Sequence, residues 1–171
     1  MRIYIIGFMG SGKSTLGKPI ARALGCNFYD LDNYIEQQMG STIAAIFEQQ
    51  GEAAFRALET KYLEELSAAN ENCVISTGGG TPCFGDNMEM INSLGMSVYL
   101  QQEVSVLTHR LLNSKISRPL IAGKTPEQLR SFIEQKLAER EPYYKRASIT
   151  VADAERDASR IINVLKFSTQ I

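Results

Sequence analysis

Short apolar runs alternate along this chain with longer segments in which apolar residues recur every three or four positions. The apolar runs predict β-strands at residues 3–7, 27–32, 73–77, 96–101 and 147–151. The longer segments predict helices at residues 13–24, 51–69, 103–113, 126–140 and 155–167. Strands that alternate with helices in this way indicate βαβ units, and hence an α/β fold whose parallel sheet is covered by helices on both faces.

The strand predicted at 73–77 leads directly into three consecutive glycines, Gly78, Gly79 and Gly80. Three glycines in a row lose more backbone entropy on folding than a single turn glycine does. We therefore expect another group to approach the backbone at this point more closely than a β-carbon would allow.

The connection between the helices predicted at 103–113 and 126–140 is the least regular part of the chain. It contains Pro119, Gly123 and Pro126 and is long for a connection in a compact domain. Loops of this length are usually functional lids or are disordered. We interpret approximately residues 113–126 as a mobile lid.

Length and composition fit a single domain that spans residues 1–171. Of these residues 44% are hydrophobic and 22% are charged, enough for one globular core with little room for a second. Lys and Arg total 18 against 19 Asp and Glu, which gives a net charge of −1. Without an overall positive field, we expect neither nucleic acid nor a membrane surface as a partner. Any anion site must be local.

The cysteines and the first residues predict a cytoplasmic protein. Cys26, Cys73 and Cys83 are odd in number and show no C-x-x-C spacing, which argues against a disulfide framework or a zinc site and favours a reducing compartment. The opening MRIYIIG lacks the features of a signal peptide, and no apolar run approaches membrane-spanning length. A monomer is the default expectation for a domain of this size.

The strongest motif is G-x-x-x-x-G-K-[ST], which spans Gly7–Ser14 between a predicted strand and a predicted helix. Its backbone N–H groups, with Gly10, Ser11 and Gly12 in the loop, can surround a polyphosphate at the positive end of the helix dipole. The alternative is a chance glycine-rich turn. Because strand, loop, lysine, serine and helix are all in register, the motif favours binding of ATP or GTP.

Three side chains at the end of this motif have distinct predicted roles. Lys13 can bridge the β- and γ-phosphates, and the Ser14 hydroxyl can coordinate Mg²⁺. Thr15 lies in the first helical turn, near the α-phosphate. GTPase switches also need D-x-x-G and N-K-x-D, and neither pattern occurs in this sequence. One compact domain with a candidate lid suits a kinase of small metabolites or nucleotides.

Asp30 and Asp32 end the second predicted strand. Two residues apart in an extended segment, they would point the same way, toward the P-loop at the carboxyl edge of the sheet. One carboxylate could hold Mg²⁺ through water while the other accepts a proton from a substrate hydroxyl. The alternative is that either one caps a helix that begins near Asn33.

The arginines have structural as well as functional interpretations. Arg56 and Glu59 lie three residues apart with Phe55 alongside, and with Glu52 they could form an ordinary solvated charge ladder. Taken alone, the pattern at Arg56 fits such a surface better than a site.

Three further arginines lie near the lid or follow it. Arg118 precedes Pro119, which keeps it on an extended loop where it could stabilise charge during phosphoryl transfer. Arg110 precedes the lid and could reach the nucleotide. Arg140 could instead be a favourable cation near a helix carboxyl end.

The chain resembles the shikimate kinase family over essentially its whole length. The matching segments are, in order, GFMGSGKST, DLD, FRALE, STGGG, RPLI and EREPYY. Very many proteins share the P-loop alone, whereas DLD, FR-x-x-E and GGG combined with a lid R-P-L are specific. The resemblance implies a three-layer α/β/α P-loop kinase fold of the nucleoside monophosphate kinase type, with a central five-stranded parallel sheet and a mobile lid.

The resemblance also implies the reaction. ATP with Mg²⁺ would phosphorylate the 3-hydroxyl of shikimate to give shikimate 3-phosphate and ADP, a step of chorismate and aromatic amino-acid biosynthesis. Lys13, Mg²⁺ and Arg118 would neutralise the phosphoryl oxygens, and Ser14 and Asp30 would hold the metal. Asp32 would hydrogen-bond the reacting hydroxyl and could act as base.

The substrate-binding residues implied by the resemblance lie on two predicted helices and the glycine turn. Arg56 and Arg140 resemble the pair that grips the substrate carboxylate, since guanidinium forks suit that anion. Glu59 would orient Arg56, and Phe55 would pack against the ring. Gly78–Gly80 would hold substrate against their backbone, Gly79 foremost, which would explain the three glycines.

Other residues receive less specific assignments. Arg110 and Arg156 are candidates for the nucleotide, and the alternative for Arg156 is an ordinary surface residue. His109 has no motif support and is expected on a helix surface. Cys83 follows the glycine turn closely enough to be modifiable, although packing is the simpler role.

Two alternatives to shikimate phosphorylation remain at this point. The first is a related P-loop kinase, such as a gluconate kinase or a nucleoside monophosphate kinase, although a neutral polyol would not demand paired arginines. The second is a catalytically inactive nucleotide-binding homologue, against which the intact Lys13, Ser14, Asp30, Asp32 and Arg118 argue.

Overall fold

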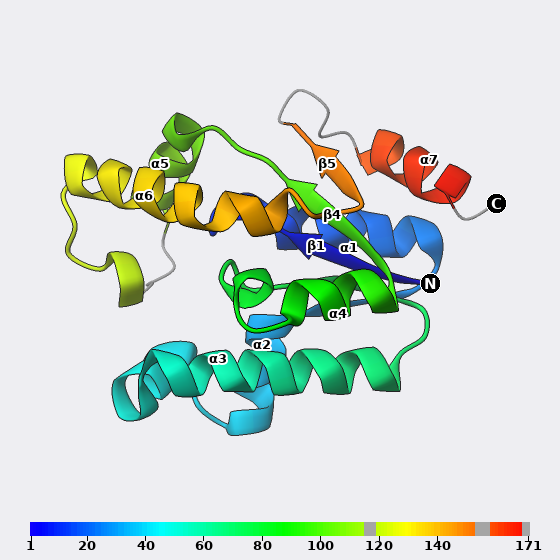
Figure 1. Cartoon of the computed structure of the whole chain (residues 1–171), viewed down its shortest axis with the longest axis horizontal. Coiled ribbons are helices and arrows are strands. Elements are labelled where there is room, and N and C mark those ends of the chain that lie inside the picture. Colours follow the sequence, from blue (N-terminus) through cyan, green and yellow to red (C-terminus); the bar gives the residue numbers. More distant parts are fainter. Residues whose placement is uncertain (115–118, 153–157, 169–171) are drawn as a thin grey trace.

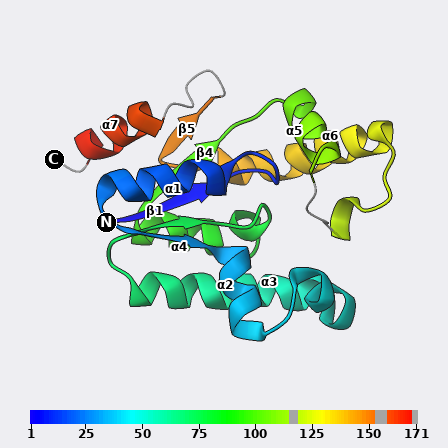
Figure 2. The ribbon, with the colours of Figure 1, turned by 180° about the vertical axis from the view of Figure 1, so that it is seen from behind.

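The computed structural model describes residues 1–114, 119–152 and 158–168, and within them a parallel sheet lies between two layers of helices (Figures 1 and 2). The strands are β1 (Arg2–Ile6), β2 (Asn27–Asp30), β3 (Cys73–Ser76), β4 (Met96–Leu100) and β5 (Ile149–Val151). The α-helices are α1 (Lys13–Leu24), α2 (Leu31–Met39), α3 (Ile43–Ala69), α4 (Asn87–Leu94), α5 (Val104–Leu112), α6 (Pro126–Tyr144) and α7 (Ala158–Ser168). Two 3₁₀ turns are η1 (Thr81–Cys83) and η2 (Pro119–Ile121). The predicted α/β fold with a five-stranded parallel sheet is confirmed.

Alternate side chains of the central strand β1 point to opposite faces of the sheet and show which helices cover each face. Tyr4 and Ile6 pack into a core with side chains of α2, α3 and α4, whereas Ile3 and Ile5 pack against α1 and α7. All four side chains are fully buried. Both views place α3 and α7 on opposite sides of the sheet (Figures 1 and 2). A strand buried on both faces accounts for an apolar run without alternation.

The strand order β2-β3-β1-β4-β5 sets the position of the functional loops. In β1, Ile5 pairs with Ser76 of β3, and Ser76 in turn pairs with Asp30 of β2. The three strands are parallel, so the loop after β1, the glycine turn after β3 and the end of β2 all emerge at one edge of the sheet. In open parallel sheets, ligands bind at this edge.

A third apolar cluster ties α5 and α6 to the loop that follows β1. Phe8 and Met9 of that loop pack with Leu107 and Leu111 of α5 and with Ile133 of α6. Helix α6 begins with a capping box, in which the side chains of Thr125 and Gln128 each accept a hydrogen bond from the other residue's backbone N–H. The two helices are therefore fixed beside the same edge of the sheet.

The observed elements differ from the predicted ones mainly around β2 and α3. Helix α1 matches its predicted range, but α3 starts at Ile43 rather than at 51, with a break at Gly51, where φ is 79° and ψ is 174°. Helices α2 and α4 were not among the predicted helical segments, because nine and eight residues give too little periodicity to recognise. The predicted lid is described only at 113–114 and 119–126, and its mobility stays a prediction.

The predicted geometry of the two aspartates was wrong. Strand β2 ends at Asp30, so Asp32 is the second residue of α2 and not part of an extended segment. The Asp30 side chain accepts a hydrogen bond from Asn33 N at 3.3 Å and caps α2, as the alternative interpretation proposed.

The described helices include none that is long and apolar enough to span a bilayer.

Gly95, between α4 and β4, tests how tightly the amino ends of strands β1 and β4 pack. A β-carbon there would lie 2.8 Å from Arg2 Cβ and still closer to the Arg2 carbonyl oxygen. We expect Gly95→Ala to lower the free energy of unfolding by about 1–3 kcal/mol through overpacking, as measured by urea denaturation. The neighbouring exposed Ser93→Ala serves as control and should change it by less than about 0.5 kcal/mol. Equal stability of the two variants would refute the close packing.

Candidate active site

A cleft of about 1080 Å³ opens at the carboxyl ends of β1, β2 and β3. Most residues predicted for a site line it, namely Gly10, Gly12, Lys13, Ser14, Thr15, Asp30, Asp32, Phe55, Arg56, Glu59, Gly78, Gly79, Gly80, Arg110 and Arg140. Ser11 is fully buried and does not line the cleft. Arg118 and Arg156 lie outside the described residues, so their predicted roles stay predictions.

The loop after β1 has the conformation of an anion-binding turn. Gly7, Gly10 and Gly12 have φ of 142°, 78° and 91°, which only glycine adopts without strain. Lys13 folds back over the loop, and its Nζ donates to the carbonyl oxygens of Gly7 at 2.9 Å and Phe8 at 3.0 Å. The Lys13 ammonium therefore lies over the loop, at the wall of the cleft.

Ser14, Asp30 and Ser76 bring hard oxygen atoms together beside this loop. The Ser14 hydroxyl donates to Asp30 Oδ2, and Ser76 Oγ lies 3.3 Å from Ser14 Oγ. One carboxylate with hydroxyl groups suits Mg²⁺, which binds few protein ligands and keeps waters or phosphate oxygens on its other positions. Ser76 was not among the predicted site residues, but the end of β3 places it here.

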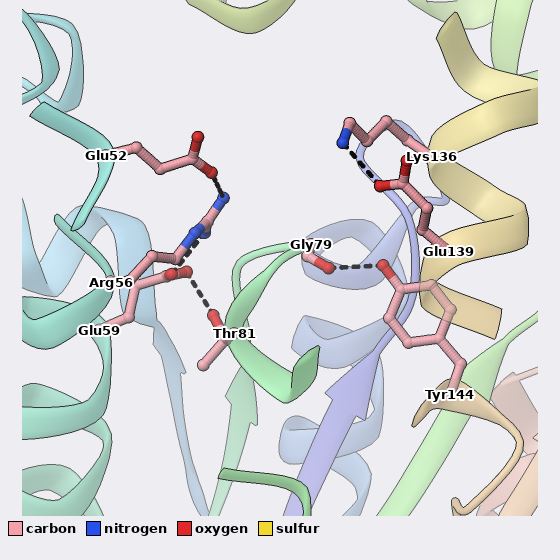
Figure 3. A network of polar contacts seen from close by, with 8 residues as sticks. All are labelled: Glu52, Arg56, Glu59, Gly79, Thr81, Lys136, Glu139 and Tyr144. Carbon is pink, nitrogen blue, oxygen red and sulfur yellow. Dashed lines mark hydrogen bonds and ion pairs between the residues drawn. The ribbon is translucent and has the colours of Figure 1, made fainter. Parts of the chain in front are cut away.

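A buried ionic network on α3 faces the glycine turn (Figure 3). Arg56 Nη1 donates to Glu59 Oε2 at 2.5 Å, and Arg56 Nη2 donates to Glu52 Oε1 at 2.9 Å. The Thr81 hydroxyl donates to the second oxygen of Glu59. Arg56 is 8% exposed and Glu59 is 0% exposed, so a solvated charge ladder is the wrong description for this pair.

The network keeps the Arg56 guanidinium charged. Burial acts to lower the pKa of Arg56, but the charges and hydrogen bonds of Glu59 and Glu52 outweigh it and raise the pKa overall. The guanidinium carbon also lies 5.5 Å from the centroid of the Phe55 ring. The result is a buried, oriented cation at the wall of the cleft.

Two of the three glycines make room for this network. A β-carbon on Gly78 would overlap the Glu59 carboxylate, and one on Gly80 would overlap the Arg56 guanidinium. None of the three glycines has a positive φ, so backbone conformation does not demand them. The groups that approach the turn closely are therefore side chains of the protein itself.

Gly79 and Arg140 meet on the other side of the turn. The carbonyl oxygen of Gly79 accepts a hydrogen bond from the Tyr144 hydroxyl at 2.5 Å. A β-carbon on Gly79 would lie 3.1 Å from Met9 N and 3.4 Å from Arg140 Nη1. Arg140 is 9% exposed, and its buried Nη1 has no hydrogen-bond partner among the described residues. A buried guanidinium nitrogen in this state indicates an anionic or polar ligand.

Several lining residues were missed from the sequence. Phe47, whose ring centroid lies 4.7 Å from that of Phe55, and Ile43 lie on the early part of α3, outside the predicted helix, and Thr42 caps that helix. The FRALE segment signalled Phe55 but gave no sign of its partner. Thr81 adjoins the quoted STGGG segment and Tyr144 is the last residue of the quoted EREPYY segment, so both could have been found from these motifs.

Three predicted residues remain, namely Arg110, His109 and Cys83. Arg110 on α5 donates to Gly10 O at 3.4 Å and so stands beside the phosphate-binding loop. His109 is exposed, as expected. Burial raises the pKa of the Cys83 thiol to about 11, so it stays protonated at neutral pH and is a poor nucleophile.

Comparison with known proteins gives one consistent family. The family model described as shikimate kinase matches residues 9–167. The shikimate kinase of Azobacteroides pseudotrichonymphae is 47% identical over 148 residues, covering 86% of this chain and 87% of the relative. The crystal structure of shikimate kinase from Bacteroides thetaiotaomicron superimposes with a TM-score of 0.89 at 41% identity, covering 100% of this chain and 99% of that one. Shikimate kinase from Acinetobacter baumannii in complex with shikimate gives 0.87 at 36% identity, covering 98% and 94%.

Thr81 tests the buried network. We expect Thr81→Val to lower the free energy of unfolding by about 1–3 kcal/mol, because an oxygen of buried Glu59 loses its donor. Thr60→Val is the matched control, since the Thr60 hydroxyl only returns to the Arg56 carbonyl oxygen of its own helix. Urea denaturation of both variants measures the difference, and equal midpoints would mean that Thr81 does not support Glu59.

Proposed function

This chain belongs to the shikimate kinase family, and we propose that it transfers the γ-phosphoryl group of ATP to the 3-hydroxyl of shikimate. The products are shikimate 3-phosphate and ADP, and the reaction is a step of aromatic amino-acid biosynthesis. The observation that carries the proposal is one cleft lined both by a phosphate-binding loop and by two buried arginines, Arg56 and Arg140. Such a cleft suits a polyphosphate and a carboxylate held face to face.

The nucleotide end uses the loop after β1 and the start of α1. Backbone N–H groups there, at the positive end of the helix dipole, suit the phosphates of ATP. Lys13 would exchange its carbonyl partners for phosphate oxygens, a favourable exchange because charge-assisted hydrogen bonds are stronger. Arg110 stands close enough to Gly10 to reach the nucleotide, and the same role is proposed for Arg156.

Ser14 and Asp30 would hold Mg²⁺, and their oxygen donors fit that ion. Bound there, Mg²⁺ supplies neutralising charge for the phosphate oxygens. Asp30 also has a structural role. Its carboxylate caps α2 and accepts a hydrogen bond from the Ser14 hydroxyl.

The acceptor end binds the substrate carboxylate between Arg56 and Arg140. The Nη1 atom of Arg140, without a partner among the described residues, offers a donor for one carboxylate oxygen. Glu59 and Glu52 fix the orientation of Arg56 through hydrogen bonds from its two Nη atoms, and the guanidinium carries further N–H donors that we assign to the ligand. Phe55 packs at the wall of the same cleft. The backbone of Gly78–Gly80 forms the floor.

We propose that Asp32 acts on the reacting hydroxyl. It lies in the first turn of α2, and its Oδ1 comes within 3.2 Å of the position that a β-carbon of Gly78 would take. The carboxylate therefore borders the glycine turn on the side of the P-loop cleft. There it would hydrogen-bond the 3-hydroxyl and accept its proton as the phosphoryl group transfers. Arg118 is proposed to stabilise the transferring group from the lid.

The family match, and not the paired arginines alone, favours shikimate over gluconate. Gluconate also carries a carboxylate, which two buried guanidiniums could bind. An inactive homologue would have no need of Asp32 beside Lys13 and Ser14. The monomeric state and cytoplasmic location expected from the sequence stay predictions.

Release of ADP from ATP and Mg²⁺, with shikimate, gluconate or AMP as acceptor, tests the proposed function. We expect strong stimulation by shikimate alone. Stimulation by gluconate or AMP instead would keep a P-loop kinase but overturn shikimate as the acceptor. No stimulation by any of the three would favour the inactive homologue.

Arg140→Ala tests the carboxylate site. We expect the KM for shikimate to rise about 10- to 100-fold, the equivalent of a lost charged hydrogen bond, with little change in the KM for ATP. Arg140 is preferred over Arg56, because removing Arg56 would leave the buried Glu59 charge uncompensated. Arg130→Ala is the control, since Arg130 is an exposed residue of the same helix paired with Glu134. An unchanged KM for shikimate would remove Arg140 from the site.

Asp32→Asn tests the proton acceptor. We expect kcat to fall about 100-fold or more, because an amide cannot take the proton, while both substrates still bind. Steady-state kinetics with each substrate varied separate the two parameters. A kcat close to that of the unmodified protein would exclude an essential role for Asp32.

A further inference from the structure

We propose that the Tyr144 hydroxyl is a positioning group, which holds the Gly79–Gly80 peptide plane so that Gly80 N–H faces the substrate side of the turn. The inference rests on the proposed function and extends it to a residue without direct substrate contact. Figure 3 shows Tyr144 on α6 pointing at the Gly79 carbonyl, across the turn from the Arg56 network on α3.

The direction of the hydrogen bond is fixed by its partners. A carbonyl oxygen can only accept, so the Tyr144 hydroxyl is the donor to Gly79 O, at 2.5 Å. The side chain is 0% exposed, and burial raises the pKa of the phenol well above its usual range. The hydroxyl therefore stays protonated and remains a donor over the whole physiological pH range.

The ring of Tyr144 is itself held in place. Its centroid lies 5.0 Å from that of Tyr99 on β4, with 32° between the ring planes. Both rings belong to the apolar core between the sheet and α3 and α4. The hydroxyl thus reaches the turn from a rigid support, so that its position is determined by the core and not by the ligand.

Planarity of the peptide bond carries this constraint to Gly80. No peptide bond in the described residues is cis, so the Gly79 carbonyl and the Gly80 N–H point in opposite directions. With the carbonyl turned toward α6, the N–H is turned toward α3. On that side the Arg56 guanidinium lies against Gly80. Gly80 N–H and Arg56 are therefore presented together, as two donors for one anionic or hydroxylic ligand.

The glycine turn needs such an external constraint. A peptide between two glycines has no β-carbon on either side to restrict its rotation, so it has more accessible orientations than any other peptide. The Glu59 and Arg56 side chains exclude β-carbons at Gly78 and Gly80 and so prevent local stiffening. The hydrogen bond from the Tyr144 hydroxyl to the Gly79 carbonyl oxygen restricts the rotation of this peptide instead.

Tyr144→Phe removes the hydroxyl and keeps the ring. We expect the KM for shikimate to rise about 3- to 10-fold, the usual worth of one neutral hydrogen bond, while the KM for ATP changes less than about twofold. Tyr99→Phe is the matched control, because Tyr99 is equally buried in the same ring pair and lies on β4. We expect that variant to keep both KM values.

A second readout does not depend on turnover. In ¹⁵N–¹H NMR spectra without substrate, we expect the Gly80 amide signal to shift or broaden in Tyr144→Phe and to stay unchanged in Tyr99→Phe. This result would support the positioning role even if shikimate proved not to be the acceptor. An unchanged Gly80 signal would overturn the inference, as would equal rises in both KM values, which would indicate general disruption of the fold.

Discussion

The buried ion pair between Arg56 and Glu59 is the interaction on which the substrate end of the cleft depends. A buried ion pair is tolerated where additional hydrogen bonds compensate its loss of water, and here Glu52 and Thr81 supply such bonds. The pair also requires room, which the glycine turn provides because it has no β-carbons to overlap it. The composition of the turn, the orientation of the guanidinium and the shape of the cleft therefore depend on one another.

The parallel sheet joins this packing to the phosphate-binding loop. Strands β2, β3 and β1 are parallel neighbours. The two aspartates, the glycine turn and the P-loop therefore follow adjacent strands and lie at the same edge of the sheet. Helix α6 lies on the other side of the glycine turn from α3, and its residues Arg140 and Tyr144 approach Gly79 there. In-line transfer between two bound molecules needs this kind of fixed separation, since catalysis of phosphoryl transfer rests on positioning and charge.

The sequence predicted most of the fold and most of the residues that line the cleft, for reasons that are local. The range of α1, the five strands and the P-loop follow from periodicity and motif spacing over a few residues. What it could not predict depends on contacts between distant segments. The solvated ladder at Arg56 and Glu59 was a sound interpretation of three residues on one helix, but Thr81 lies on another element. The glycines were likewise explained by a ligand, whereas the protein's own side chains need that space.

A crystal structure of the chain with shikimate and ADP bound tests the central claim most directly, namely that the arginine pair and the P-loop hold the two substrates in one cleft. The account predicts the shikimate carboxylate between Arg56 and Arg140, its ring on Gly78–Gly80, and its 3-hydroxyl beside Asp32, facing the phosphates of ADP. A carboxylate bound away from both arginines, or a 3-hydroxyl turned from Asp32, would contradict it.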